Sequence, residues 1–373
     1  MRVFVTDADQ KHTLGAVRSL GSRGIEVFAG SAQRHAQSFY SRYASGRVVH
    51  PPPSHEEAFV DFLRRYVGER GIDVVLPVGY ESNVTASKNL ERLGRTVSVP
   101  VAKWENLQIA ADKARSLAFA ADLGIPIPRT FASIEEVDRF PAVAKGALGS
   151  GRVRYLNSRA DFEVSARPGD ILQEYVPGDG YGFYALFRQG EARAIFMHRR
   201  IREFPVTGGA STAAESVYDP HLRDLGLRLL EALRWHGVAM VEFKKDTRDG
   251  EYKLMEINPK FWGSLDLAIA AGVDFPYLAA TMAFEGDVEP VLEYRPGIRY
   301  HWPLPDEVLH VLARPVSMPA VVRDSLDPST RSNVWRKDLK PNLFQAGLTA
   351  AQVLACSGTG RLFAPHGRPR TSL

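Results

Sequence analysis

Two apolar segments separated by a short turn place the strongest constraint on the fold. Residues 238–246 and 251–259 flank the turn Thr-Arg-Asp-Gly, a pattern that predicts a β-hairpin. Glu242 lies in the first strand. Glu256 and Asn258 lie two residues apart in the second strand and therefore share one of its faces. Apolar residues flank both positions, so we expect this strand to be largely buried.

Carboxylates in a buried hairpin indicate a cation site. Two carboxylates that meet on one buried face, with an amide beside them, repel each other unless a cation joins them. Hard oxygen ligands in this number suit Mg²⁺ or Mn²⁺, with phosphate oxygens completing the coordination. We therefore expect Glu242, Glu256 and Asn258 to hold a metal ion. The alternative, that they are exposed strand residues, is disfavoured by the apolar residues around them.

Strand and helix patterns alternate over the first hundred residues. This alternation predicts a doubly wound parallel α/β layer. No G-x-G-x-x-G follows the first strand, so the tight glycine turn of a dinucleotide site is missing and an NAD-linked oxidoreductase is disfavoured. We expect strands at 2–6, 25–30, 72–78 and 96–100, and helices at 13–23, 55–70 and 82–93.

After residue 110 the pattern becomes that of an antiparallel α+β region. Beyond residue 290 prolines interrupt it. The fold class we expect is therefore α/β and α+β, with an α/β layer over 1–110, a two-lobed domain over 111–290 and a partly irregular C-terminal extension over 291–373. The lobes are placed at about 111–180 and 181–290. The helices we expect lie at 112–124, 158–166, 219–235, 306–314 and 345–356. We also expect two strands joined by a glycine-rich turn at 142–156, a strand at 171–176, a hairpin at 183–200 and a mobile tail at 364–373.

Composition excludes several classes of function. Lys and Arg number 47 and Asp and Glu 43, a net charge of +4 without a block of like charges, so no nucleic-acid partner is expected. The single cysteine, Cys356, excludes an intrachain disulfide and a cysteine-rich metal site. The first apolar run is too short for a signal peptide, and no segment approaches 18 apolar residues. We expect a soluble cytoplasmic protein without a membrane partner.

Two of the few lysines have positions suited to phosphate binding. Lys145 closes an apolar strand and is followed by a glycine-rich turn that includes Gly149 and Ser150. Backbone N–H groups of such a turn, together with the ammonium group, can hold a polyphosphate. The pattern is not a Walker A motif, and a plain hairpin turn explains it equally well when it is read alone. Lys113 begins a helix 32 residues earlier, and alone it is indistinguishable from a surface lysine.

An extended segment that ends in Pro-Gly offers backbone groups to the edge of a purine base. Its candidate residues are Gln173, Glu174, Tyr175 and Val176, and Asp179 is placed to reach a ribose hydroxyl. An ordinary strand that runs into a turn is the alternative.

A basic strand end precedes a segment of small residues. Arg199, Arg200 and Arg202 come before 203–214, which contains two adjacent glycines and few apolar residues. Arg199 and Arg202 are our candidates for holding an anionic group of a substrate, and a solvated basic strand end is the alternative. Residues 205–212 are expected to form a mobile lid.

Taken in order, these features resemble the ATP-grasp superfamily, in which a lysine near a helix, a lysine before a small-residue loop and a hinge precede Glu … Glu-x-Asn-Pro-Arg. The resemblance covers roughly 1–285, and Glu256-Ile-Asn258-Pro with the upstream Val-Glu-Phe is its specific part. The segments 199–212 and Asn-Pro-Lys-Phe-Trp-Gly-Ser are similar to predicted carboligases that resemble the carbamoyl-phosphate synthase large subunit. Lys260 replaces the usual arginine, which keeps the charge but loses the bidentate fork.

The resemblance implies an ATP-dependent carboxylate–amine ligase, or one that uses another nucleophile, with Mg²⁺ and an acylphosphate intermediate. Lys113, Lys145 and the hinge would bind ATP, and Lys260 would take part in catalysis. The ends of the first strands, with Asp7 and Ser82, would contribute to the acceptor site. An ATP-binding regulatory module without ligase turnover is the alternative. The carboxylate, the nucleophile and the oligomeric state stay open.

Overall fold

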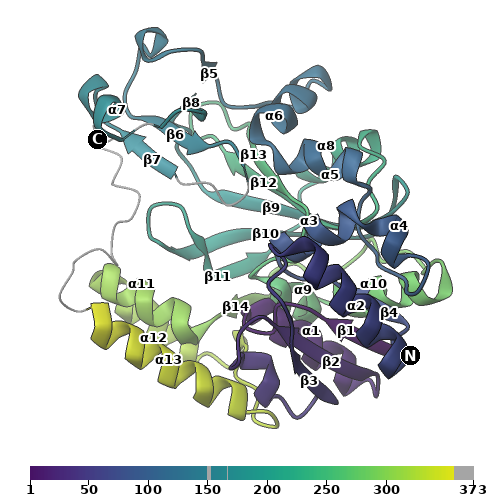
Figure 1. Cartoon of the computed structure of the whole chain (residues 1–373). Helices are drawn as coiled ribbons and strands as arrows, with labels where there is room; N and C mark the ends of the chain where they lie inside the picture. Colours follow the sequence, from purple (N-terminus) through teal and green to yellow (C-terminus); the bar gives the residue numbers. More distant parts are fainter. Residues whose placement is uncertain (149–152, 166, 357–373) are drawn as a thin grey trace.

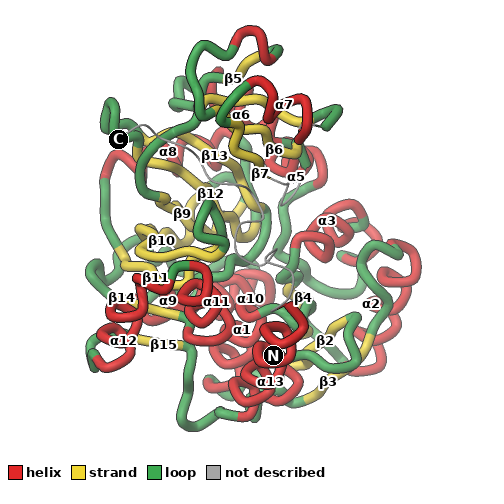
Figure 2. Tube along the Cα trace, turned by 90° about the vertical axis from the view of Figure 1, so that its left-hand side faces the viewer, coloured by secondary structure: helices red, strands yellow, loops and turns green. Residues whose placement is uncertain are grey.

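The computed structural model describes residues 1–148, 153–165 and 167–356. Their strands form three sheets, and Figures 1 and 2 both place the largest sheet between the other two. The predicted combination of α/β and α+β structure is confirmed. The predicted tail at 364–373 lies outside the described residues.

The N-terminal sheet is parallel throughout, in the order β3-β2-β1-β4. Alternate residues of its central strand enter different cores: Val3 and Val5 pack with α1, whereas Phe4 packs with α2. Both faces are therefore covered, as the apolar strands require. The elements of this region are β1 (Arg2–Val5), α1 (Lys11–Ser22), β2 (Glu26–Ser31), β3 (Gly46–Val49), α2 (Glu56–Arg70), β4 (Val74–Leu76), α3 (Tyr80–Lys88), α4 (Leu90–Leu93) and α5 (Trp104–Ala111).

Two predictions for this region need correction. The strand expected at 96–100 is a single bridge between Ser98 and Val74, because Pro100 has no N–H group with which to extend the ladder. The helix expected at 82–93 is two helices that meet at Asn89, where the backbone leaves the helical conformation.

A small antiparallel sheet follows, in the order β5-β8-β6-β7. Its apolar face covers a separate core that includes Phe131, Leu156 and Leu172. The elements are α6 (Lys113–Asp122), β5 (Thr130–Phe131), β6 (Ala142–Gly146), β7 (Val153–Leu156), α7 (Arg159–Ser165) and β8 (Asp170–Glu174).

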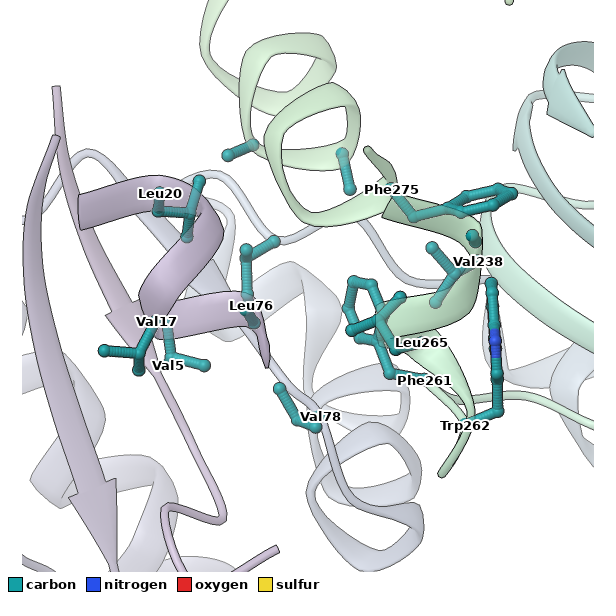
Figure 3. Close-up of a cluster of buried hydrophobic side chains, with 14 of the residues drawn as sticks. Val5, Val17, Leu20, Leu76, Val78, Val238, Phe261, Trp262, Leu265 and Phe275 are labelled. Atoms are coloured by element: carbon teal, nitrogen blue, oxygen red, sulfur yellow. The ribbon is translucent and has the colours of Figure 1, made fainter. Parts of the chain in front are cut away.

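The largest sheet has seven strands in the order β13-β12-β9-β10-β11-β14-β15. It contains the predicted hairpin, in which Glu242 pairs with Glu256. Helices α9 and α10 pack the sheet against the N-terminal layer, where Phe261, Leu265 and Phe275 face Val5 and Leu76 (Figure 3). The elements are β9 (Gly180–Arg188), β10 (Glu191–Phe204), β11 (Ala210–Ser216), α8 (Pro220–Ala232), β12 (Gly237–Lys245), β13 (Tyr252–Asn258), α9 (Leu265–Ala271), α10 (Phe275–Glu285), β14 (Arg299–His301) and β15 (Arg331–Ser332).

The predicted lid is shorter than expected. Residues 210–216 form β11, whose Ser211 and Thr212 are buried, so the loop prediction is wrong for 210–212. The cause is β14, a strand that the sequence did not suggest: β11 pairs with β10 on one side and with β14 on the other. The segment left between strands is 205–209.

The chain beyond residue 302 forms helices α11 (Val308–Ala313), α12 (Met318–Leu326) and α13 (Lys340–Cys356). Arg18 of α1 anchors this region. Its guanidinium group lies 2.8 Å from the Asp338 carboxylate, donates to the carbonyl groups of Asn333 and Asp338, and reaches Asn342. The side chains of Arg18 and Asp338 are 1% and 2% exposed. The ion pair therefore joins the two ends of the chain inside the protein.

In the part of the chain that the structure describes, no single helix has both the length and the apolar character needed to cross a membrane. Helices α9 and α10 together have both, but a bend of 86° separates them.

We predict that Arg18→Met strongly destabilises the protein, because it leaves the Asp338 carboxylate buried without its cation. Loss of one partner of a buried pair costs about 3–5 kcal/mol, and urea denaturation should show a fall of that size in the free energy of unfolding. The control is Arg65→Met, whose side chain is 70% exposed and pairs with Glu69; it should cost less than about 1 kcal/mol. Equal effects of the two changes would contradict a structural role for the buried pair.

Candidate active site

A cavity of about 440 Å³ lies between the small sheet and the seven-stranded sheet. One wall comes from β6, β7 and the end of β8, and the other from β10, β12, β13 and the segment after β13. Cationic and anionic side chains both face it. They are Lys113, Lys145, Arg200, Lys244 and Lys260, and Glu174, Glu203, Glu242 and Glu256.

The structure brings most of the predicted site residues to this cavity. Nine of them line it: Lys113, Lys145, Glu174, Tyr175, Val176, Glu242, Glu256, Asn258 and Lys260. Gly149 and Ser150 lie outside the described residues. Gln173, Asp179, Arg199 and Arg202 are described but do not line the cavity.

The two central carboxylates lie on neighbouring strands, and each has a cation beside it. An Oε2 atom of Glu256 lies 3.2 Å from Lys113 Nζ, and Glu242 Oε1 lies 2.6 Å from a guanidinium nitrogen of Arg200. Asn258 donates to Glu256 Oε1 at 2.7 Å. Lys113, from α6, and Arg200, from β10, therefore balance the charge that the hairpin buries.

Burial and neighbouring charge act in opposite directions on these carboxylates. Burial raises the pKa of Glu242, and the nearby Glu256 charge acts in the same direction despite the Arg200 cation. Burial also opposes ionisation of Glu256, but Lys113 and the Asn258 amide hold the pKa of Glu256 below its ordinary value. The pair therefore shares a buried site in which negative charge depends on a cation.

The donor set fits a magnesium ion. Two carboxylates and the Asn258 side chain line one cavity from neighbouring strands, and Mg²⁺ takes one or two carboxylates and leaves other positions for water and phosphate. Among the described residues there is no group of three or more His, Cys, Asp or Glu that could hold a metal by themselves. Phosphate oxygens of a substrate would have to complete the coordination.

Burial lowers the pKa of three lysines that line the cavity. Burial lowers the pKa of Lys145 to about 8, although the Glu256 and Glu242 charges act against this shift. Burial likewise lowers the pKa of Lys244 and of Lys260. A phosphate group in the cavity would restore the charged forms, because it replaces the lost hydration with a counter-charge.

The predicted hinge contributes backbone groups and an aromatic ring to the cavity, because its carboxylate is already paired with other side chains. Glu174 is held by Arg248 at 2.7 Å and by Lys253 at 3.5 Å, so its carboxylate is already paired. Lys244 Nζ donates to the Val176 carbonyl at 2.7 Å and lies 5.2 Å from the centre of the Tyr175 ring. These contacts give the cavity an end with an aromatic ring and a polar backbone.

The other hinge residues point away from the cavity. Gln173 is buried, and its amide donates to the Thr130 hydroxyl at 3.2 Å. Asp179 is largely exposed and lies 3.6 Å from Arg199. Both therefore have structural neighbours in place of a ligand.

A β-bulge decides which arginine of β10 reaches the site. Arg200 pairs with Ala214 and Arg202 with Ala213, so Ile201 is the extra residue. Without the bulge, Arg200 and Arg202 would share a face. Instead Arg200 lines the cavity, whereas Arg202 makes a paired contact with Glu307 and lies 2.6 Å from Asp324.

The sequence contained a signal for some of the residues that were missed. Lys244 lies two positions after Glu242 on the same strand, so period-two alternation places it on the cavity face. Glu203 follows the bulge and could not be placed without it. Tyr184 and Trp262 reach the cavity from β9 and from the segment after β13, and nothing in the local sequence marks them.

Comparisons with known proteins agree with this geometry. Residues 167–303 match a family described as ATP-grasp in the biosynthetic pathway with Ter operon. The N-terminal section of the carbamoyl phosphate synthase large chain of Methanopyrus kandleri is 25% identical over 245 residues, which are 58% of this chain and 42% of that protein. The chain thus spans about two fifths of the length of this relative.

Solved structures share the fold at low sequence identity. An L-amino acid ligase from Bacillus licheniformis has a TM-score of 0.62 at 17% identity, covering 77% of this chain and 75% of the other. Biotin carboxylase from Campylobacter jejuni gives 0.63 at 13%, covering 80% and 74%. N5-carboxyaminoimidazole ribonucleotide synthetase from Thermotoga maritima gives 0.57 at 18%, covering 79% and 78%. Together with the hairpin carboxylates, these similarities support the ATP-grasp resemblance.

Proposed function

We propose that the protein is an ATP-dependent ligase that joins a small-molecule carboxylate to an amine or another nucleophile. The observation that carries the proposal is the cavity itself, where five cationic side chains surround two buried carboxylates. Two of the structural neighbours are by name a ligase and a synthetase, and biotin carboxylase is described in complex with an ATP analogue. The match to a carbamoyl phosphate synthase section supports a carboligase in particular.

The charges along the cavity favour one orientation for ATP. Lys113 and Lys145 would meet the phosphates as point charges, and the purine would lie toward Tyr175 and Val176, where backbone groups and Lys244 are available. Glu242, Glu256 and Asn258 would hold Mg²⁺ (or Mn²⁺), which supplies charge neutralisation at the phosphates. This arrangement gives Lys113, Lys145 and the metal ion a counterpart among the phosphates of the nucleotide.

The proposed reaction needs no protein nucleophile. An oxygen of the substrate carboxylate attacks the γ-phosphorus, the bond to the bridging oxygen breaks, and ADP leaves. The acylphosphate is then attacked by the amine, which releases inorganic phosphate and forms the new bond. Arg200 and Lys260 lie beside the carboxylate pair, where they can stabilise charge on the transferred group. Arg200 takes over the role that the sequence assigned to Arg199 and Arg202.

The segment 205–209 is suited to excluding water from an acylphosphate. It joins β10 to β11 at the cavity edge, and the Tyr155 hydroxyl of the small sheet donates to the Thr207 carbonyl at 2.5 Å. One hydrogen bond therefore connects the loop to the opposite wall of the cavity. An opening of the loop would break few apolar contacts.

The test is a screen of amino acids and small carboxylic acids for stimulated release of ADP and phosphate. The proposal requires that release depend on both an acid and a nucleophile. A regulatory ATP-binding module would bind ATP without such stimulation, and that result would overturn the ligase proposal.

We predict that Glu256→Gln lowers Mg²⁺-dependent turnover at least about 100-fold, because it removes one of two carboxylates that face the transferred charge. The side-chain shape is preserved, but Lys113 loses the charge beside it, so the melting temperature is measured in parallel to separate loss of the metal site from loss of the fold. Glu251→Gln is the matched control, since Glu251 begins the same hairpin but is exposed. Wild-type turnover in Glu256→Gln would remove this residue from the metal site.

A second prediction concerns pH. Because burial lowers the pKa of Lys145 to about 8, the free protein loses this charge as pH rises through 8. ATP affinity should then fall by up to about tenfold for each pH unit above 8, with proton uptake on binding. Calorimetry in buffers of different ionisation enthalpy measures both. Lys145→Arg should bind ATP without this dependence, and Lys145→Met should bind weakly at every pH. A pH-independent wild type would place Lys145 away from the phosphates.

A third prediction concerns the loop. We expect 205–209 to exchange amide hydrogens readily without ATP and to become protected with ATP, Mg²⁺ and substrate. Tyr155→Phe removes the hydrogen bond to Thr207, so exchange there should speed up about tenfold in the free protein. Tyr218→Phe is the control, because its hydroxyl contacts Arg223 outside the cavity. Equal protection with and without ligands would show a rigid loop and exclude a lid role.

A further inference from the structure

A second cavity, of about 770 Å³, lies at the end of the seven-stranded sheet that β14 and β15 form. It is lined by α1, the loop at Tyr43, α9, Arg295, β14 and the segment 328–337. Helix α1 contacts α9, and β14 contacts β15. Among the described residues, none lines both this cavity and the ATP cavity.

The charges around this cavity are unequal. Arg295, Arg331, Arg336 and Lys337 line it, and the one carboxylate among its described lining residues is Asp266. No carboxylate of the described chain lies within 4 Å of the charged groups of these four cations. The lining thus carries an excess of positive charge that the protein itself does not neutralise, and an anion would be attracted to it.

Asp266 gives the cavity a second chemical character. It is 6% exposed, and its Oδ2 accepts a hydrogen bond from Trp302 Nε1 at 3.1 Å. Gly15 of α1 lies against it: a Cβ atom at this position would stand 2.8 Å from Asp266 Oδ1. The absence of a side chain on Gly15 therefore leaves room for the carboxylate at the cavity floor. Burial raises the pKa of Asp266, so its ionised form lacks sufficient stabilisation from the protein.

The walls between floor and rim are aromatic. Tyr43, Tyr300 and Trp335 line the cavity, and Tyr300 is almost fully buried. Aromatic walls suit a small organic molecule better than a hydrated inorganic ion, because they gain from contact with carbon atoms.

We propose that this cavity binds a small zwitterionic metabolite, with its phosphate or carboxylate at the arginines and its amine at Asp266. An ammonium group would stabilise the ionised carboxylate, and the guanidinium groups would hold the anion through charge-assisted hydrogen bonds. The site is separate from the proposed ligase reaction. It does adjoin it along the chain, because α9 carries Asp266 and directly follows Trp262, Gly263 and Ser264 of the ATP cavity.

The test is calorimetric titration of the full chain with three probes. O-phosphoethanolamine has both groups, ethyl phosphate lacks the amine, and β-alanine replaces the phosphate with a carboxylate. We expect O-phosphoethanolamine to bind at least about tenfold more tightly than ethyl phosphate. β-Alanine binding would identify a carboxylate ligand, and its absence a phosphate ligand. Ethyl phosphate binding as tightly as O-phosphoethanolamine would overturn the proposal.

Variants assign the binding to this cavity. The double change Arg331→Ala and Arg336→Ala should weaken O-phosphoethanolamine at least about tenfold. Asp266→Asn, which still accepts from Trp302, should weaken O-phosphoethanolamine but not ethyl phosphate. Lys145→Met should leave binding unchanged, which separates this site from the ATP cavity whether or not the ligase proposal holds. Arg65→Ala is the exposed control. Binding that resists the double change, or that Lys145→Met abolishes, would show that the cavity is not the site.

Discussion

The active site depends on the pairing of buried cations with buried carboxylates. The hairpin brings Glu242 and Glu256 side by side, and neither could stay ionised there alone. Lys113 and Arg200 supply the missing charge from two other elements, α6 and β10. The position of both elements is thereby linked to the hairpin. A metal ion that entered with ATP would compete with these two cations, which would then be free to meet the phosphates.

The sequence predicted the site best where charged residues lie in segments that are otherwise apolar and should be buried. Acidic residues inside an apolar hairpin have few explanations, so Glu242, Glu256 and Asn258 could be placed together without a structure. Lys145 gained its role from its position before a glycine-rich turn. The three hairpin residues face one cavity because strand alternation encodes their common face, and Lys145 lines the same cavity from the small sheet.

Other features depended on contacts that a local pattern does not contain. Residues 210–214 read as part of a loop because they are small, yet they belong to β11, a strand between β10 and β14. The partner strand β14 lies about a hundred residues further along the chain, in a region that prolines made hard to interpret. The bulge at Ile201 could not be predicted from the local pattern either. One extra residue changes which face of the sheet each later residue of the strand occupies.

That bulge also gives Arg200 and Arg202 of β10 different structural roles. On one side of Ile201, Arg200 serves the cavity, and on the other, Arg202 holds Glu307 and Asp324 of the C-terminal region. Two identical side chains, two positions apart, thus belong to different parts of the molecule. Deletion of Ile201 would make the two arginines consecutive residues of a regular strand, and they would still point to opposite faces. A related chain without the extra residue could therefore keep both roles with its two arginines side by side in sequence.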